Sequence, residues 1–379
     1  MPRQNIPTEW GPQSDGDDSF TRKCRLLQSW YRYTVLKEEF GIGPHENSGN
    51  KYGNMLVNGG ITGSNFLSPD IFEYAKFRKA FEKNGETIQE FRLFNNMLSS
   101  QTMCFNLFFP LKRLFERNEP DASRVFAACF PALNIKKVLA VEIEYFPYPK
   151  DEYLNDQTAF DAMILFKNAD GKKCILAFET KYREKLGENP SSDLLPQIKL
   201  SKVSGLFNEQ GQQYAEKGMS QLGRNFLLAL KYAEAHHLDM AYAVVISPIE
   251  NPSTNEIREF NTLMIGEAQN RVFWKSLESF INEIESNCPK QMKIWPQKFR
   301  KRYLDFGPIS EYLPGGLLVA NDQVLAPIRP NGNAQPINGQ RPYPEHLAWL
   351  EKFNIARRAK GLPEAKNKRY REDPNYVAP

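Results

Sequence analysis

The chain has 379 residues, of which 41% are hydrophobic, and its 49 Lys and Arg side chains exceed its 45 Asp and Glu side chains by only four. This length is sufficient for one large domain with elaborations or for two domains, and no apolar run is long enough to span a membrane. The four histidines lack metal-site spacing and the five cysteines form no C-x-x-C pair, which excludes zinc and redox motifs and indicates a reducing, cytoplasmic location.

Residues 1–85 are expected to form an amino-terminal elaboration. This region has a polar start, a helix-like segment at 22–39 and a stretch rich in glycine and asparagine at 41–64. The core is expected to occupy residues 86–250 and to begin with a helix from Glu86 to about Phe109.

Three strands are predicted in the middle of the chain, at 137–146, 158–166 and 173–182. Each run is rich in β-branched, aromatic and other large apolar residues and has the length of one strand. The second and third runs are joined by turn residues, among which Gly171 can take the positive φ of a short hairpin loop. The first run alternates, so Glu142 and Glu144 share one face, as polar residues also do in an ordinary edge strand.

A long helix is predicted near 209–236, and a strand follows at 241–247. Apolar residues recur along the helix at core spacing. Gln221 and Arg224 lie together on its polar flank.

Residues 251–306 are predicted to form a helical layer that supports the core. Their apolar stripe consists of Trp274, Leu277, Phe280 and Ile281.

Residues 307–379 are first rich in proline and glycine and then basic. The last 39 residues hold nine Lys and Arg and five Asp and Glu, so the whole net charge of +4 resides there. The basic cluster, which includes Arg357 and Arg358, has three interpretations. It is an arm that contacts phosphates, a short helix near 345–353 that docks on the protein, or a solubilising tail.

Charged residues stand at the ends of two apolar strands. Asp161 opens the second run, and Glu179 and Lys181 share one face of the third. Charges are costly to bury unless they pair or coordinate a metal. This cost indicates a functional site.

The order of these elements resembles that of the PD-(D/E)xK nuclease superfamily, whose restriction-endonuclease-like core runs αβββαβ around a mixed β-sheet flanked by helices. The resemblance covers roughly residues 86–250. In addition, the segment Ser99-Ser-Gln-Thr-Met-Cys-Phe-Asn106 is similar to a helix of a set of bacterial proteins classed as restriction endonucleases. One departure is Phe160, which stands where the motif name has proline.

The resemblance implies that Asp161 and Glu179 bind Mg²⁺, for which Mn²⁺ is a substitute, and that Thr180 donates its backbone carbonyl to the ion. It implies that Lys181 orients and activates the attacking water. An acidic neighbour is also expected, for which Glu144 is the candidate. A polar residue of the later helix should reach the site or the phosphate backbone, and the candidates are Gln221 and Arg224.

The three-residue motif by itself is weak, because Asp170-Gly171-Lys172 and Glu364-Ala365-Lys366 also match it. Only Glu179–Lys181 ends an apolar strand whose hairpin partner carries an acid. The competing interpretation is a surface strand end with an ordinary ion pair, which contributes little energy and no chemistry.

The sequence therefore predicts an α/β restriction-endonuclease-like protein with N- and C-terminal elaborations. The expected function is Mg²⁺-dependent hydrolysis of DNA, in restriction or another defence role. The expected partner is double-stranded DNA, and a homodimer would supply the two sites that double-strand cutting needs. Two alternatives stay open: a catalytically silent nucleic-acid-binding or assembly subunit with the same fold, and a repair or RNA-processing nuclease.

Overall fold

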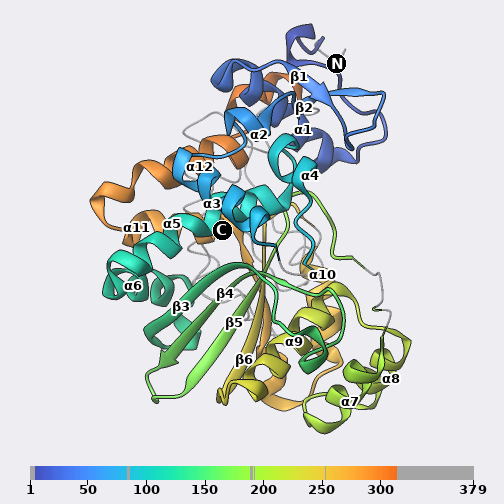
Figure 1. The fold of residues 1–379 in the computed structure, drawn as a ribbon, viewed down its shortest axis with the longest axis vertical. Helices are drawn as coiled ribbons and strands as arrows, with labels where there is room; N and C mark the ends of the chain where they lie inside the picture. The colour runs from blue at the N-terminus through green and yellow to red at the C-terminus, as the bar shows by residue number, and fades with distance from the viewer. Residues whose placement is uncertain (1–4, 83–85, 188–190, 192, 252, 314–379) are drawn as a thin grey trace, which may run out of the picture. The chain divides into compact units, whose positions relative to one another are not determined.

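A mixed five-stranded sheet forms the centre of the described chain, which comprises residues 5–82, 86–187, 191, 193–251 and 253–313 of this computed structural model (Figure 1). In spatial order the strands are β3 (Ile135–Tyr145), β4 (Phe160–Asn168), β5 (Lys173–Thr180), β6 (Met240–Ser247) and β7 (Val272–Ser276). The first three pair antiparallel, whereas β6 is parallel to β5 and β7 is parallel to β6. The predicted fold class, a mixed sheet flanked by helices, is confirmed.

Helices cover both faces of this sheet (Figure 1). On one face lie α5 (Ser100–Arg117), α6 (Glu119–Cys129), α11 (Leu277–Asn287) and α12 (Ile294–Tyr303). On the other lie α9 (Gln221–Ala235), α7 (Leu195–Val203), α8 (Glu209–Lys217) and α10 (Ser253–Thr262). The buried ring of Phe108 on α5 contacts Phe178 of β5, while Met163 and Ala177 belong to the core on the α9 side. Side chains at adjacent strand positions therefore point to different helical layers, one containing α5 and the other α9.

The amino-terminal part adds a small two-stranded sheet and further helices. These elements are α1 (Ser19–Tyr31), β1 (Phe40–Ile42), β2 (Lys51–Leu56), α2 (Gly59–Thr62), α3 (Pro69–Ala80) and α4 (Glu90–Asn95). Within the unit Asn5–Ile309, α1 packs against β2 and α12. The helix-like segment predicted at 22–39 is α-helical only to Tyr31 and continues as a π-helical turn, Arg32–Leu36.

The helix predicted from Glu86 to about Phe109 is wrong as a single element, because it divides into α4 and α5. Asn96 lies between them in a bridge with Met55, and its side chain accepts hydrogen bonds from Asn54 and from the backbone of Leu98. These contacts satisfy polar groups that a continuous helix would have to bond internally. The bridge to Met55 and the bond from Asn54 connect segments about forty residues apart, so the local pattern does not contain them.

Pro110 lies inside α5, which continues to Arg117 beyond the predicted end. Proline has no N–H to donate to the carbonyl of Asn106, four residues earlier. The indole Nε1 of Trp295 donates to that carbonyl at 2.9 Å instead. A partner from α12 thus replaces the missing helical donor.

The helix predicted at 209–236 is two helices, α8 and α9, separated at Gly218. This glycine has φ +94, and α8 ends there. Ser220 then caps α9 by accepting a hydrogen bond from the backbone of Gly223. Gln221 is consequently the first residue of α9 and lies at the end of the sheet that carries the acids.

The segment predicted to be helical at 251–306 contains the fifth strand, which corrects that prediction. Val272–Ser276 pairs parallel with β6, and Trp274 belongs to this strand rather than to a helical stripe. The other members of the stripe, Leu277, Phe280 and Ile281, are buried on α11. A short apolar run cannot be assigned to helix or strand from its periodicity, and here the exposed edge of β6 decides the outcome.

Two further findings bear on the predictions for the ends of the chain and for membranes. The basic cluster containing Arg357 and Arg358, and the short helix considered near 345–353, lie outside the described residues. Among the helices of the described part of the chain, none has the length and apolarity needed to cross a membrane.

Candidate active site

Three acidic residues occupy neighbouring positions on β3, β4 and β5. The pairs Ile143–Ala162 and Ala162–Phe178 are in register, so the next positions bring Glu144, Asp161 and Glu179 side by side. Each of the three acids lines a single cleft of about 600 Å³, as does Lys181. The strand alternation predicted for Asp161 and Glu179 therefore holds.

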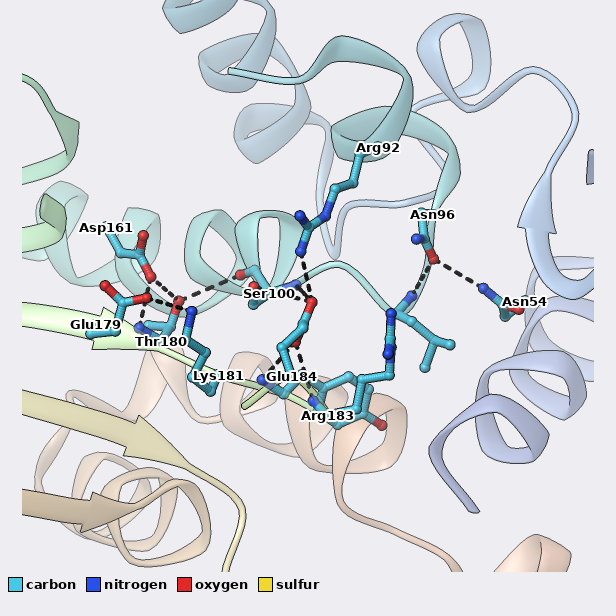
Figure 2. Close-up of polar contacts among 12 residues, drawn as sticks. Asn54, Arg92, Asn96, Ser100, Asp161, Glu179, Thr180, Lys181, Arg183 and Glu184 are labelled. Carbon is cyan, nitrogen blue, oxygen red and sulfur yellow. Dashed lines mark hydrogen bonds and ion pairs between the residues drawn. The ribbon is translucent and has the colours of Figure 1, made fainter. Parts of the chain in front are cut away.

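Asp161 is fixed by the residue that follows Glu179. Its Oδ2 atom accepts hydrogen bonds from the backbone N–H and from the hydroxyl of Thr180, each at 2.7 Å (Figure 2). Among the described residues, Oδ1 has no hydrogen-bond partner. Burial and the nearby Glu179 carboxylate raise the pKa of Asp161 from 3.8 to about 7, because both disfavour the charged form.

Glu179 and Lys181 form a buried ion pair held by α9. The Nζ atom of Lys181 lies 2.7 Å from Oε1 of Glu179 and donates to Oε1 of Gln221 at 2.9 Å. The Nε2 atom of Gln221 donates back to Glu179 at 2.7 Å, and Asn225 donates to the other Glu179 oxygen. Burial acts to lower the pKa of Lys181, but the Glu179 and Asp161 carboxylates outweigh it, so the net pKa lies above its usual value. The lysine is therefore a protonated cation at neutral pH.

Glu144 is the third acid of the cleft, and its carboxylate has fewer hydrogen bonds within the described residues than those of Asp161 and Glu179. Its Oε2 atom accepts a hydrogen bond from Gln101 at 3.1 Å, while Oε1 is buried without a hydrogen-bond partner in the described part of the chain. Burial and the negative charge of Asp161 raise its pKa well above the usual range. Glu142, by contrast, pairs with Lys112 at 3.1 Å and does not line the cleft.

The two residues predicted to contact nucleic acid from the later helix differ in their surroundings. The side-chain amide of Gln221 is engaged by the ion pair, whereas Arg224 lines the cleft and donates to the carbonyl of Met219 at 3.0 Å. Sequence reasoning missed Asn225 and Gln101. Asn225 follows Gln221 by four residues, so the two side chains lie on the same face of one helix. This spacing could have identified Asn225 as a second residue at the site. The available signal for Gln101 was its place in the segment Ser99–Asn106, but only the packing of α5 brings it to Glu144.

The donor set of the cleft suits a small divalent cation. Carboxylate oxygens are the preferred ligands of Mg²⁺, which retains several waters and uses few protein groups. A cation would relieve the mutual repulsion of Asp161 and Glu179, and it would give a partner to the Glu144 oxygen that has none within the described residues. Within the described residues, no cluster of three or more His, Cys, Asp or Glu side chains could hold a metal by itself. Water and backbone oxygens would therefore complete the shell.

The raised pKa of Asp161 predicts an unusual dependence of stability on pH. Between about pH 4 and pH 7 the folded state holds a proton that the unfolded state has released, so the free energy of unfolding should fall as pH rises through this window. Urea unfolding in EDTA at pH 5 and pH 8 measures the effect. Asp161→Asn should gain stability relative to the wild type at pH 8 but not at pH 5. An equal difference at both pH values would contradict the raised pKa.

Comparison with known proteins gives one match. The family model of the PD-(D/E)XK nuclease superfamily matches residues 15–305, which extends on both sides of the region 86–250 in which the sequence resemblance was recognised. No curated protein and no solved structure matches the chain.

Proposed function

Because the chain belongs to the PD-(D/E)XK nuclease superfamily, we propose that it is a Mg²⁺-dependent nuclease that hydrolyses double-stranded DNA in a cytoplasmic restriction or other defence role. The observation that carries this proposal is the convergence of Asp161, Glu179 and Lys181 in one cleft, with Glu144 beside them. The alternative of a silent subunit would not require a lysine cation fixed beside two acids.

Asp161, Glu179 and the backbone carbonyl of Thr180 are the groups that would hold the cation, with Glu144 as an additional neighbour. The bound ion would stabilise negative charge on the phosphate and lower the pKa of a coordinated water. Thr180 keeps one oxygen of Asp161 occupied, so its other oxygen is the one available for the ion.

Lys181 supplies a fixed positive charge to the reacting phosphate. Glu179 and Gln221 hold its Nζ atom from two sides, so little reorganisation is needed when charge develops on the phosphate oxygens. The Glu179 and Asp161 carboxylates raise the pKa of Lys181, which favours the charged form that can act as an electrostatic group and orient the water.

Basic residues on the walls of the cleft support a polyanionic substrate. Arg92, Lys150 and Arg224 line it in addition to Lys181, and Arg224 is proposed to contact the phosphate backbone. The tail residues Arg357 and Arg358 are proposed to add contacts that do not depend on sequence.

Incubation with plasmid, linear duplex, single-stranded DNA and RNA, each with EDTA, Mg²⁺ or Mn²⁺, tests the function. We expect metal-dependent cleavage of duplex DNA. Cleavage of RNA alone would change the substrate but keep the chemistry. Binding of nucleic acid without cleavage of any substrate would favour the silent subunit. A dimer seen by light scattering would support double-strand cutting by two sites.

Gln221 is proposed to position Lys181 rather than to bind nucleic acid. Gln221→Ala should therefore lower kcat by about 10–100-fold, with little change in KM, because residues that orient a site typically act on this scale. Gln213→Ala, which removes an exposed glutamine of α8, is the matched control and should leave kcat unchanged. If Gln221→Ala instead raises KM and leaves kcat unchanged, Gln221 is a substrate contact, as the sequence first suggested.

A further inference from the structure

Arg92 lines the cleft from α4, whereas Gln221 and Asn225 line it from α9. The Nη2 atom of Arg92 contacts Oε1 of Glu184 at 2.7 Å. Within the described part of the chain, Nη2 is the only nitrogen of Arg92 that has a hydrogen-bond partner. The Nε and Nη1 donors of a side chain that is 38% exposed thus remain for a ligand in the cleft.

Glu184 is a fixed anchor for this arginine. Its carboxylate also accepts hydrogen bonds from the backbone N–H and hydroxyl of Ser100 at the start of α5, each at 3.4 Å. Burial acts to raise the pKa of Glu184, but the neighbouring cations Arg92, Arg183 and Lys181 outweigh it, so its pKa lies below the usual range. The group is therefore an ionised carboxylate held on several sides.

The anchor is joined to the catalytic cluster by continuous contacts. Figure 2 shows contacts that run from Asp161 through Thr180 and Ser100 to Glu184 and Arg92. The Thr180 hydroxyl gives its single proton to Asp161 at 2.7 Å and only approaches the Ser100 carbonyl, at 3.5 Å. The Glu184–Arg92 pair therefore contacts the acid cluster through Ser100. Three cations, Arg92, Arg183 and Lys181, lie near Glu184 and offset its charge, and Lys181 is itself paired with Glu179.

We propose that Arg92 binds a second, non-reacting phosphate of the nucleic-acid strand, and that Glu184 is the positioning residue that aims it. Nε and Nη1 lie on different edges of the guanidinium, so a two-donor contact to two oxygens of one phosphate would use one of them together with the second N–H of Nη2. Lys181 is held at Glu179 and Gln221, on the α9 side, whereas Arg92 enters from α4. The two cations thus reach the cleft from different elements, as contacts with different phosphates would require. This inference rests on the proposed nuclease function and specifies its substrate as a chain with more than one phosphate.

Two substrates separate the second phosphate from the reacting one. Bis(p-nitrophenyl) phosphate has a single phosphodiester, whereas a 30-nucleotide duplex has many phosphates. With Mn²⁺, Arg92→Ala should lower kcat/KM on the duplex roughly tenfold through KM, as expected for loss of a charged hydrogen bond. Its turnover of bis(p-nitrophenyl) phosphate should be unchanged. An equal loss on both substrates would place Arg92 at the reacting phosphate and overturn the proposal.

Arg300→Ala is the matched control. Arg300 is 34% exposed, its Nη2 atom lies 2.9 Å from Glu285, and it does not line the cleft. This variant removes the same charge and should leave the turnover of both substrates unchanged. If Arg92→Ala behaves like Arg300→Ala, Arg92 is an ordinary surface ion pair. If Arg92→Ala does not fold, Arg92→Lys replaces it, since a lysine keeps the charge but not the two-donor edge and should still weaken duplex binding.

A binding measurement keeps this inference distinguishable from the nuclease proposal. In the Asp161→Asn background, anisotropy of a labelled duplex should show affinity about tenfold lower after Arg92→Ala. The slope of log affinity against log salt should fall by about 0.9. Glu184→Gln should weaken binding in that background and have a much smaller effect once Arg92 is replaced. If no substrate is cleaved but these shifts appear, the nuclease proposal fails and the phosphate contact stands. Unchanged affinity and slope would overturn the contact.

Discussion

Replacing Lys181 with alanine should reduce kcat on DNA by about 10²–10³-fold, while the affinity for DNA stays nearly unchanged. The reason is that a preorganised cation beside the phosphate acts mainly on charge that develops in the transition state. Single-turnover cleavage at saturating Mg²⁺ and anisotropy binding give the two quantities separately.

Lys112→Ala is the control for this prediction. Lys112 is also a partly buried lysine paired with a glutamate, Glu142, but it lies outside the cleft, so its loss should leave kcat unchanged. Lys181→Met retains the aliphatic stem and tests whether the loss of activity comes from the charge. Normal cleavage by either Lys181 variant would make the lysine structural and leave the motif without its cation.

Asp161→Asn should abolish cleavage and remove most of the stabilisation that Mn²⁺ confers on the wild type. An ion bound only to the folded state at a hundredfold excess over its Kd adds about 2.7 kcal/mol to the free energy of unfolding. Asparagine can still accept the hydrogen bonds from Thr180, but it loses the charge that attracts the ion. Thermal melts with EDTA or with Mn²⁺ measure the difference.

The control for the metal prediction is Glu142→Gln. Glu142 is on β3 but is paired with Lys112 outside the cleft, so this variant should gain as much stability from Mn²⁺ as the wild type does. Equal stabilisation of Asp161→Asn and the wild type would exclude Asp161 as a ligand. If Mn²⁺ stabilises neither Asp161→Asn nor Glu142→Gln, the loss would point to a general change in folding.

Local periodicity was sufficient for four of the five strands of the sheet and for the central pair of acids. The strands near 137–146, 158–166, 173–182 and 241–247 are all present with small shifts at their ends. Alternation of side chains and a short turn between β4 and β5 bring Asp161 beside Glu179. Whether these residues catalyse the reaction stays a prediction.

The tertiary structure decided where the helices break. The helix predicted from Glu86 divides because Asn96 bonds to Asn54, and Trp295 supplies the donor that Pro110 lacks. The strand β7 forms because β6 offers it a parallel edge. Each of these outcomes depends on a partner far away in the chain, so no local pattern contains it.

The sequence by itself determined that charged residues stand at the ends of apolar strands. Strand formation and the alternation of its side chains depend on neighbours only one or two positions away, so a local pattern contains them. The tertiary structure decided how each charge is satisfied. It placed Gln221 and Asn225 on the Glu179–Lys181 pair and fixed Arg92 on Glu184. It left one oxygen of Glu144 with no hydrogen-bond partner among the described residues. The physical reason is that a buried charge must be compensated by whatever polar group packing brings within hydrogen-bond distance, and packing joins segments that the sequence keeps apart.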